Sequence, residues 1–351
     1  MPRPAATTAA PSDPGATRLD RSVQLGPCQY RVLIRAGAGA RAALTAAARD
    51  LGAARFLLVA AARTPADQLA EAAATLAPAG ELLVLRGAPG VPLSFPEPTP
   101  DTVVVLLGGR RALRAGLACA GRARLVHLPT TLAAMCDAAV GVQPDGAGGL
   151  RAPAQVWCRP DLLRGPQHAG LYPLLRNVLA ICPYHLRAVA DRLRPDGRYP
   201  APVLAAFVAL CVEARAGVLA YDPLGTGPGT VLRYGEGTLQ GLLRAARTAR
   251  RLGLLDAADE AAHHELLAAA GVRVVPSEPT PEVAELVLLR ALGHPHTTAG
   301  SLLTPVRADR TAVDATAVAD ADTLDTLDTA DTAAPPVARD AGRPVPVRAG
   351  R

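Results

Sequence analysis

Short apolar runs alternate with alanine-rich amphipathic segments along the first half of this 351-residue chain. A continuous apolar run bounded by turn residues predicts a buried strand, and apolar residues that recur every three or four positions predict a helix. The pattern predicts strands at residues 30–34, 56–61, 81–85, 102–109 and 125–128, and helices at 40–50 and 65–76. Strands and helices that alternate at this spacing indicate a parallel sheet with helices on its faces.

From about residue 165 the pattern becomes helical. Helices are predicted at 169–181, 185–193, 202–219, 238–251, 257–270 and 281–291. We therefore expect a Rossmann-like α/β domain over residues 21–164, followed by an α-helical domain over 165–307. The Pro-, Ala- and Thr-rich residues 1–20 and the acidic, then basic, low-complexity residues 308–351 are predicted to be disordered.

The composition narrows the class of protein. All 37 basic residues are arginines, and the formal net charge is +6. The arginines are spread along the chain without a basic helix or stacking aromatic residues, so no nucleic-acid partner is expected. The six cysteines form no C-x-x-C pair, which indicates reduced thiols. No apolar run long enough for a membrane span and no secretory signal are recognised, so we expect a cytoplasmic protein that does not bind membranes.

One stretch, residues 125–141 (LVHLPTTLAAMCDAAVG), has the features of a ligand-binding turn. It consists of a short buried strand, a Pro-Thr-Thr turn and a helix start, where the hydroxyl of Thr130 or Thr131 can cap the helix. In an α/β sheet, ligands bind where strands end and helices begin. An ordinary strand-to-helix connection would show the same pattern.

The residues of this stretch closely resemble a known signature. HLPTTLAAMCDA resembles the V-P-T-T-x-L-A-x-x-D-[AS] motif of the sugar-phosphate cyclases, the 3-dehydroquinate synthase-like family. Segments that resemble its 2-deoxy-scyllo-inosose synthase branch are found at residues 169–181, 207–222, 231–238 and 301–307. The resemblance implies a dehydroquinate synthase-like fold, NAD and a divalent metal (zinc or cobalt) as cofactors, and a dimer.

The family's NAD site is only partly matched. Gly108 and Gly109 follow a strand as in the family's G-G-G motif, and together with Thr130 and Thr131 they are the candidate cofactor-binding residues. Arg110 stands in place of the third glycine. The family's G-E-x-x-K motif is missing between residues 87 and 101, so NAD binding is expected to be weakened.

The family's metal ligands are not matched. The resemblance places the ligand glutamate at Pro173 and the first ligand histidine at Glu236, and the motif with the second histidine is missing. The adjacent His263 and His264 point in different directions on a helix and make a poor replacement. No metal site is therefore predicted.

Four positions keep substrate-facing residue types. Asp137 and Asn177 match family residues, and Arg176 and Arg215 stand where the family has lysines, so these four are candidate substrate-binding residues with no confident catalytic residue among them. Our leading hypothesis is a non-catalytic paralogue, a homodimer or a heterodimer with an active cyclase, that acts in aminoglycoside or aminocyclitol biosynthesis. The alternative is an active synthase with a rebuilt site that converts glucose 6-phosphate with NAD and a divalent metal.

Overall fold

The computed structural model describes residues 16–89, 91, 94–95, 97–121, 123–273, 284–295 and 306–308. Its centre is a seven-stranded sheet in the order β1-β2-β9-β6-β5-β3-β4, in which β1 is antiparallel to β2 and every other neighbouring pair is parallel. The strands are β1 (Thr17–Leu25), β2 (Cys28–Ala36), β3 (Arg55–Ala60), β4 (Glu81–Arg86), β5 (Thr102–Leu107), β6 (Arg124–Leu128) and β9 (Gln155–Cys158).

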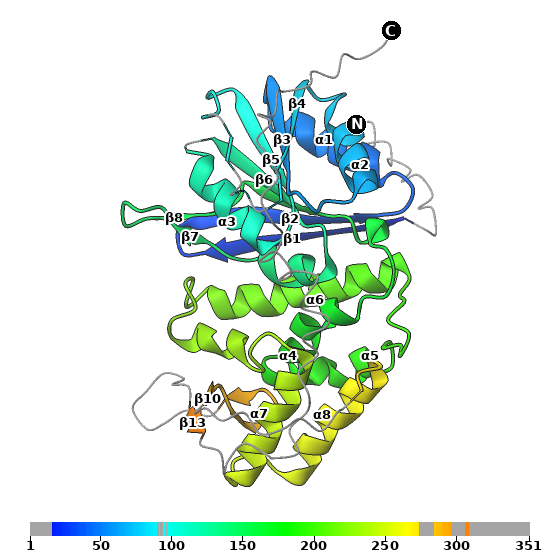
Figure 1. Cartoon of the computed structure of the whole chain (residues 1–351), viewed down its shortest axis with the longest axis vertical. Helices are drawn as coiled ribbons and strands as arrows, with labels where there is room; N and C mark the ends of the chain where they lie inside the picture. Colours follow the sequence, from blue (N-terminus) through cyan, green and yellow to red (C-terminus); the bar gives the residue numbers. More distant parts are fainter. Residues whose placement is uncertain are drawn as a thin grey trace, which may run out of the picture.

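Helices cover both faces of this sheet. The helices α1 (Ala40–Asp50) and α2 (Ala66–Leu76) pack on one face, and α3 (Arg110–Cys119) packs on the other (Figure 1). All six residues of β5 are buried, as expected for a central parallel strand with helices on both sides. The Val- and Leu-rich runs that predicted β3, β5 and β6 are therefore the strands at the centre of the sheet.

The second half of the chain is helical. It contains α4 (Tyr172–Ala180), α5 (Leu186–Ala190), α6 (Ala201–Leu219), α7 (Leu239–Arg251) and α8 (Ala257–Ala269), with short 3₁₀ turns η2 (Pro160–Leu162), η3 (His168–Leu171), η4 (Pro183–His185) and η5 (Pro228–Arg233). Figure 1 shows α6 beneath β1 and β2, with α7 and α8 farther from the sheet. One apolar core runs from β1 and β2 through α4 and α6 to α7 and α8.

Helix α6 corrects one expectation from the sequence. Its 19 residues have a mean hydropathy of 1.8, so by length and composition alone it could cross a membrane. It packs instead against β1, β2, α4 and the segment that contains Asp137. The same composition suits a helix between a sheet and a helical layer, because such a helix has apolar neighbours on more than one side.

Two further predictions of local structure were wrong. Residues 17–20, expected to be disordered, begin strand β1, whose alternate residues pack toward α6. The helix expected at 281–291 is replaced, within the described residues, by β10 (Ala284–Leu286) and β11 (Leu289–Ala291). Three consecutive residues, Val287 to Leu289, are buried there, which suits an extended segment and not one face of a helix. The predictions also lacked β9 and α3.

The remaining elements are short. They are β7 (Gln143–Pro144), which pairs with β8 (Leu150–Arg151), β12 (His294–Pro295), which pairs with β11, and β13 (Val306–Ala308), which pairs with β10. The disorder predicted for residues 308–351 is wrong at Ala308, which is the last residue of β13. The disorder predicted for residues 1–15 and 309–351 lies outside the described residues, as does most of the 301–307 motif.

Candidate functional site

A cleft with a volume of about 1060 Å³ opens at the carboxyl ends of β3 and β5. From β3 the chain continues to β4 at one edge of the sheet, and from β5 it continues to β6 on the other side. Such a reversal of strand order leaves a crevice in which α/β proteins bind ligands. The cleft is lined by the turn after β3, the start of α3, the π-helix η1 (Ala134–Ala138), α4 and η5.

The glycine pair lies at the start of α3. A side-chain carbon at Gly108 would lie 2.7 Å from Cβ of Ala112 and 3.1 Å from Cβ of Ala61, so the close packing of strand and helix requires glycine there. Gly109 lines the cleft and has open space in front of it. The next residue, Arg110, extends its guanidinium group to Asp137 on η1 and forms an ion pair with Oδ2 of its carboxylate.

The Pro-Thr-Thr turn is a helix start, as predicted. Thr131 lines the cleft, and its Oγ1 accepts a hydrogen bond of 3.1 Å from the backbone N–H of Ala134. Thr130 is not part of the cleft lining, and its carbonyl oxygen accepts from Gln68 on α2. His127 is fully buried at the end of β6, where its Nε2 lies 3.0 Å from the carbonyl oxygen of Gly108. Its role is therefore to hold the glycine turn against β6.

Asp137 is the centre of the candidate site. It lies in a π-helix, a wide turn that is often found at functional sites, and its residue exposure is only 6%. Its Oδ1 accepts from Arg215 at 2.7 Å and from Arg176 at 3.3 Å, while Oδ2 pairs with Arg110. One carboxylate thus connects α3, α4 and α6.

The other three predicted substrate residues surround Asp137, but only Arg176 reaches the cleft. All five N–H groups of Arg176 have acceptors: Asp137, Oδ1 of Asn177 and the carbonyl oxygen of Leu232. Asn177 is fully buried behind it, and Arg215 donates to Asp137 and to the carbonyl oxygen of Val140. These residues therefore hold Asp137 in place. The donor groups of Arg176 and the printed donors of Arg215, both candidate substrate-binding residues in the sequence, are directed to protein acceptors in this arrangement.

Burial, and next the neighbouring positive charges, lower the pKa values of Arg215 and Arg110. Burial, and next the charge of Arg176, lower the pKa of Arg215 to about 9. Partial burial, and next the charges of Arg215 and Arg176, lower the pKa of Arg110 to about 10. Both groups stay protonated at neutral pH, so three cations face a single carboxylate.

The chain was compared with known proteins. No protein-family model matches it. It is 34% identical over 206 residues to a 2-deoxy-scyllo-inosose synthase of Streptomyces fradiae, a match that covers 49% of this chain and 48% of that protein. A second 2-deoxy-scyllo-inosose synthase, from Streptomyces lividus, is 30% identical over 260 residues, which cover 59% of this chain and 68% of the relative. The chain belongs to the sugar-phosphate cyclase family.

Solved structures of sugar-phosphate cyclases confirm the predicted fold. A 2-deoxy-scyllo-inosose synthase complexed with carbaglucose-6-phosphate, NAD⁺ and Co²⁺ superposes with a TM-score of 0.71 at 20% identity, covering 84% of this chain and 98% of that one. A 2-epi-5-epi-valiolone synthase of Streptomyces hygroscopicus subsp. jinggangensis 5008, with NAD⁺ and Zn²⁺ bound, has a TM-score of 0.62 at 15% identity, covering 83% and 96%. The sequence match nevertheless spans only about half the length of the Streptomyces fradiae relative.

The two positions to which the sequence resemblance assigns metal ligands of the cyclase family both line this cleft. Pro173, at the start of α4, and Glu236, after η5, both line it. Proline has no donor atom, and the Glu236 carboxylate forms an ion pair with Arg244 of α7. Across the residues that the structure describes, no three His, Cys, Asp or Glu side chains are grouped to hold a metal ion. Among the described residues, Pro173 and Glu236 therefore do not form a three-ligand site for a divalent metal.

The dinucleotide cradle of the cyclase family is retained in part. Gly109 lines the cleft with open space in front of it, whereas Gly108 serves the packing of strand against helix, and Arg110 fills the place of a third glycine with a side chain bound to Asp137. The Arg110 side chain therefore occupies space over the turn that a glycine would leave open.

Two residues of the cleft were not among the predicted site residues. Tyr172 lines the cleft and donates a hydrogen bond of 2.6 Å to the carbonyl oxygen of Tyr234, and its ring lies 5.5 Å from the guanidinium carbon of Arg176. Arg233, at the end of η5, also lines the cleft and is exposed. The pairing of Arg110 with Asp137 was missed as well, although Arg110 directly follows the glycine pair.

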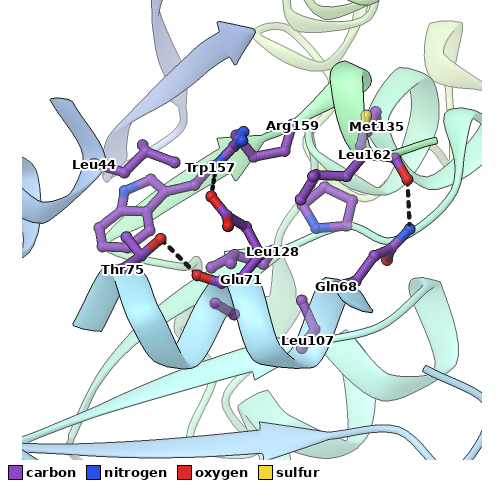
Figure 2. Close-up of a pocket in the computed structure, with 12 residues that line it drawn as sticks. Leu44, Gln68, Glu71, Thr75, Leu107, Leu128, Met135, Trp157, Arg159 and Leu162 are labelled. Carbon is purple, nitrogen blue, oxygen red and sulfur yellow. Dashed lines mark hydrogen bonds and ion pairs between the residues drawn. The ribbon is translucent and has the colours of Figure 1, made fainter. Parts of the chain in front are cut away.

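A second, much smaller cavity of about 20 Å³ lies on the opposite face of the sheet, between α2 and the ends of β5, β6 and β9. Figure 2 shows Glu71 directed to Arg159 and Gln68 directed to the carbonyl oxygen of Leu162, at 2.9 and 3.3 Å. A cavity of this size has room for about one water molecule. Its polar groups are paired with one another, so it is a packing feature and not a ligand site.

Proposed function

We propose that this chain is a non-catalytic sugar-phosphate cyclase that acts as a partner or regulator of an active cyclase in aminocyclitol biosynthesis. The proposal is supported by the side chains at the two positions that the resemblance assigns to metal ligands: Pro173 has no donor atom, and Glu236 forms an ion pair with Arg244. A metal in this family polarises the hydroxyl that is oxidised, and nothing at these two positions supplies that effect.

The state of the remaining acidic groups supports the same proposal. A general base needs a free lone pair within reach of the substrate. Among the described residues that line the cleft, the carboxylates are Asp137, held by three guanidinium groups, and Glu236, paired with Arg244. To accept a proton from a substrate, Asp137 would have to give up contacts with its guanidinium donors.

The test of this proposal is turnover. Purified protein is incubated with glucose 6-phosphate, NAD⁺ and Co²⁺ or Zn²⁺, and release of inorganic phosphate is followed beside a 2-deoxy-scyllo-inosose synthase as positive control. We expect no release above the blank without protein. Release that depends on the metal would overturn the proposal and establish the alternative, an active synthase with a rebuilt site.

The partner role needs a separate measurement. Relatives of known activity encoded by the same organism would be mixed with this chain and resolved by size-exclusion chromatography with light scattering. We expect a complex with the mass of one copy of each chain, and a change in the rate of the active cyclase when the complex forms. Two proteins that elute separately, with an unchanged rate, would contradict the regulatory role.

A further inference from the structure

The cleft is lined by more positive than negative side chains. Among its described lining residues five are arginines and two are carboxylates, Asp137 and Glu236. Both carboxylates are paired with arginines that lie outside the lining, Asp137 with Arg215 and Glu236 with Arg244. Four arginines of the lining are exposed, and they come from the turn after β3, the start of α3 and η5: Arg63, Arg110, Arg111 and Arg233. The described walls of the cleft therefore carry a net positive charge on three sides.

The same chain contains a segment of opposite charge. Residues 309–331 contain seven aspartates and one arginine and no other charged residue, which gives a formal charge of −6. Since the whole chain carries +6, the residues outside this segment carry +12. Segments with such a density of like charges stay solvated and commonly act as interaction tails. A basic surface of the same chain is the nearest partner for this one.

The acidic segment begins within reach of the cleft. Ala308, directly before it, ends strand β13, which pairs with β10. Strand β10 leads into β11, which packs against α7, and Arg244 of α7 contacts Glu236 in the cleft lining (Figure 1). An extended chain spans about 3.3 Å per residue, so the 23 residues of the segment span up to about 75 Å. A compact protein of this size is only about 50 Å across, so the segment is long enough.

From this complementarity of charge and reach we propose that the acidic segment 309–331 occupies the basic cleft of its own chain. Its carboxylates accept charge-assisted hydrogen bonds from the exposed arginines of the lining. The tether holds the segment at an effective concentration in the mM range, so a contact too weak to join two separate molecules is still well populated. Any other anion has to displace the segment to enter. The proposal goes beyond the proposed function and holds whether or not the cleft catalyses a reaction.

Repulsion within the cleft favours a carboxylate as the occupant. Burial, and next the charges of Arg215 and Arg176, lower the pKa of Arg110, and an anion beside Arg110 relieves that repulsion. Each exposed ion pair is weak, so the contact depends on the sum over several aspartates. Such pairs are screened by salt, and at about 1 M NaCl the Debye length is only about 3 Å. We therefore expect the segment to leave the cleft at high ionic strength.

The experiment is modification of the full chain with phenylglyoxal, a neutral reagent for accessible guanidinium groups, read by peptide mass spectrometry. It is compared with a full-length variant that combines Asp309→Asn, Asp314→Asn, Asp320→Asn, Asp322→Asn, Asp325→Asn, Asp328→Asn and Asp331→Asn. Arg110 and Arg233 should react at least about threefold faster in the variant, which corresponds to a cleft occupied about two-thirds of the time. Arg49, exposed on α1 across the sheet from α3, should react equally in both proteins.

A matched control keeps the acidic segment and replaces the arginines that follow it: Arg339→Gln, Arg343→Gln, Arg348→Gln and Arg351→Gln. Arg110 and Arg233 should react as slowly in this control as in the unchanged chain. All substituted residues lie outside the described residues, and matching melting curves establish that both variants fold.

Equal reaction rates of Arg110 and Arg233 in the unchanged chain and in the asparagine variant would overturn the inference. A difference that disappears on tenfold dilution would also overturn it, because the segment would then lie in the cleft of a second copy. Protection that persists at about 1 M NaCl would contradict a contact made of exposed ion pairs. The labelling needs no turnover, so phosphate release in the turnover assay would refute the proposed function and leave this result unchanged.

Discussion

Replacing Asp137 with asparagine should destabilise the protein severely. Asparagine keeps the size of the side chain but removes the charge, and its amide nitrogen donates where the carboxylate accepts. Arg176 and Arg215, with side chains 2% and 15% exposed, would then be left without their counter-ion. Removing one partner of a buried ion pair costs about 3–5 kcal/mol. The exposed Arg110 adds little, because exposed pairs contribute about 0–1 kcal/mol.

The assay is urea unfolding followed by circular dichroism, with linear extrapolation to zero denaturant. We expect the free energy of unfolding to fall by about 3–5 kcal/mol in Asp137→Asn. Asp101→Asn is the control, because Asp101 pairs with Arg55 at 2.9 Å and both side chains are more than 40% exposed; its loss should be much smaller than that of Asp137→Asn, because exposed pairs contribute little. Equal losses in the two variants would refute the reasoning, since Asp137 would then not be the electrostatic centre of the cleft.

Three further predictions concern packing, pH and metal. Gly108→Ala should lower the melting temperature, with a cost of about 1–3 kcal/mol for overpacking against Ala112, whereas Gly109→Ala, with open space around it, should be close to neutral. Burial lowers the pKa of His127 and His263 to about 4, so below pH 6.5 the unfolded chain binds more protons than the folded chain does. The free energy of unfolding should therefore fall by about 2 kcal/mol per histidine between pH 7 and pH 5. A free energy of unfolding that does not change with pH would contradict the burial of these histidines in the neutral form. Co²⁺, Zn²⁺ or EDTA should leave the melting temperature unchanged, and a rise of several degrees with either metal would reveal a ligand set that the described residues lack.

The elements that the sequence predicted correctly are those whose apolar pattern fits only one type of secondary structure. The runs of β-branched and leucine residues that became β3, β5 and β6 are buried on both faces, so burial and pattern agree. The segment 284–291 has apolar spacing that suits a helix equally well. Its conformation is decided by tertiary contacts, namely the pairing of β11 with β12 and the burial of Val287 to Leu289, which local pattern does not contain.

The sequence predicted several residues of the candidate site, but not the hydrogen bonds and ion pairs between them. Sequence motifs placed Asp137, Arg176 and Arg215 near the same ligand, and the structure brings them into contact. The motifs assign each residue to a substrate, and only coordinates reveal that the arginines are bound to Asp137 and Asn177 instead. The Arg110–Asp137 pair joins segments 27 positions apart that belong to two different family motifs, so neither motif alone predicts it.

The apolar core that runs from β1 and β2 through α6 to α7 and α8 has a consequence for how the chain can be divided. Cutting the chain after residue 164 would expose Val23, Val32 and Ile34 on the first fragment and the buried face of α6 on the second. Neither fragment would then have a complete apolar core, so the two halves should fold together and unfold as one cooperative unit. A sheet domain of this kind is therefore not a module that can be moved to another protein without its helices.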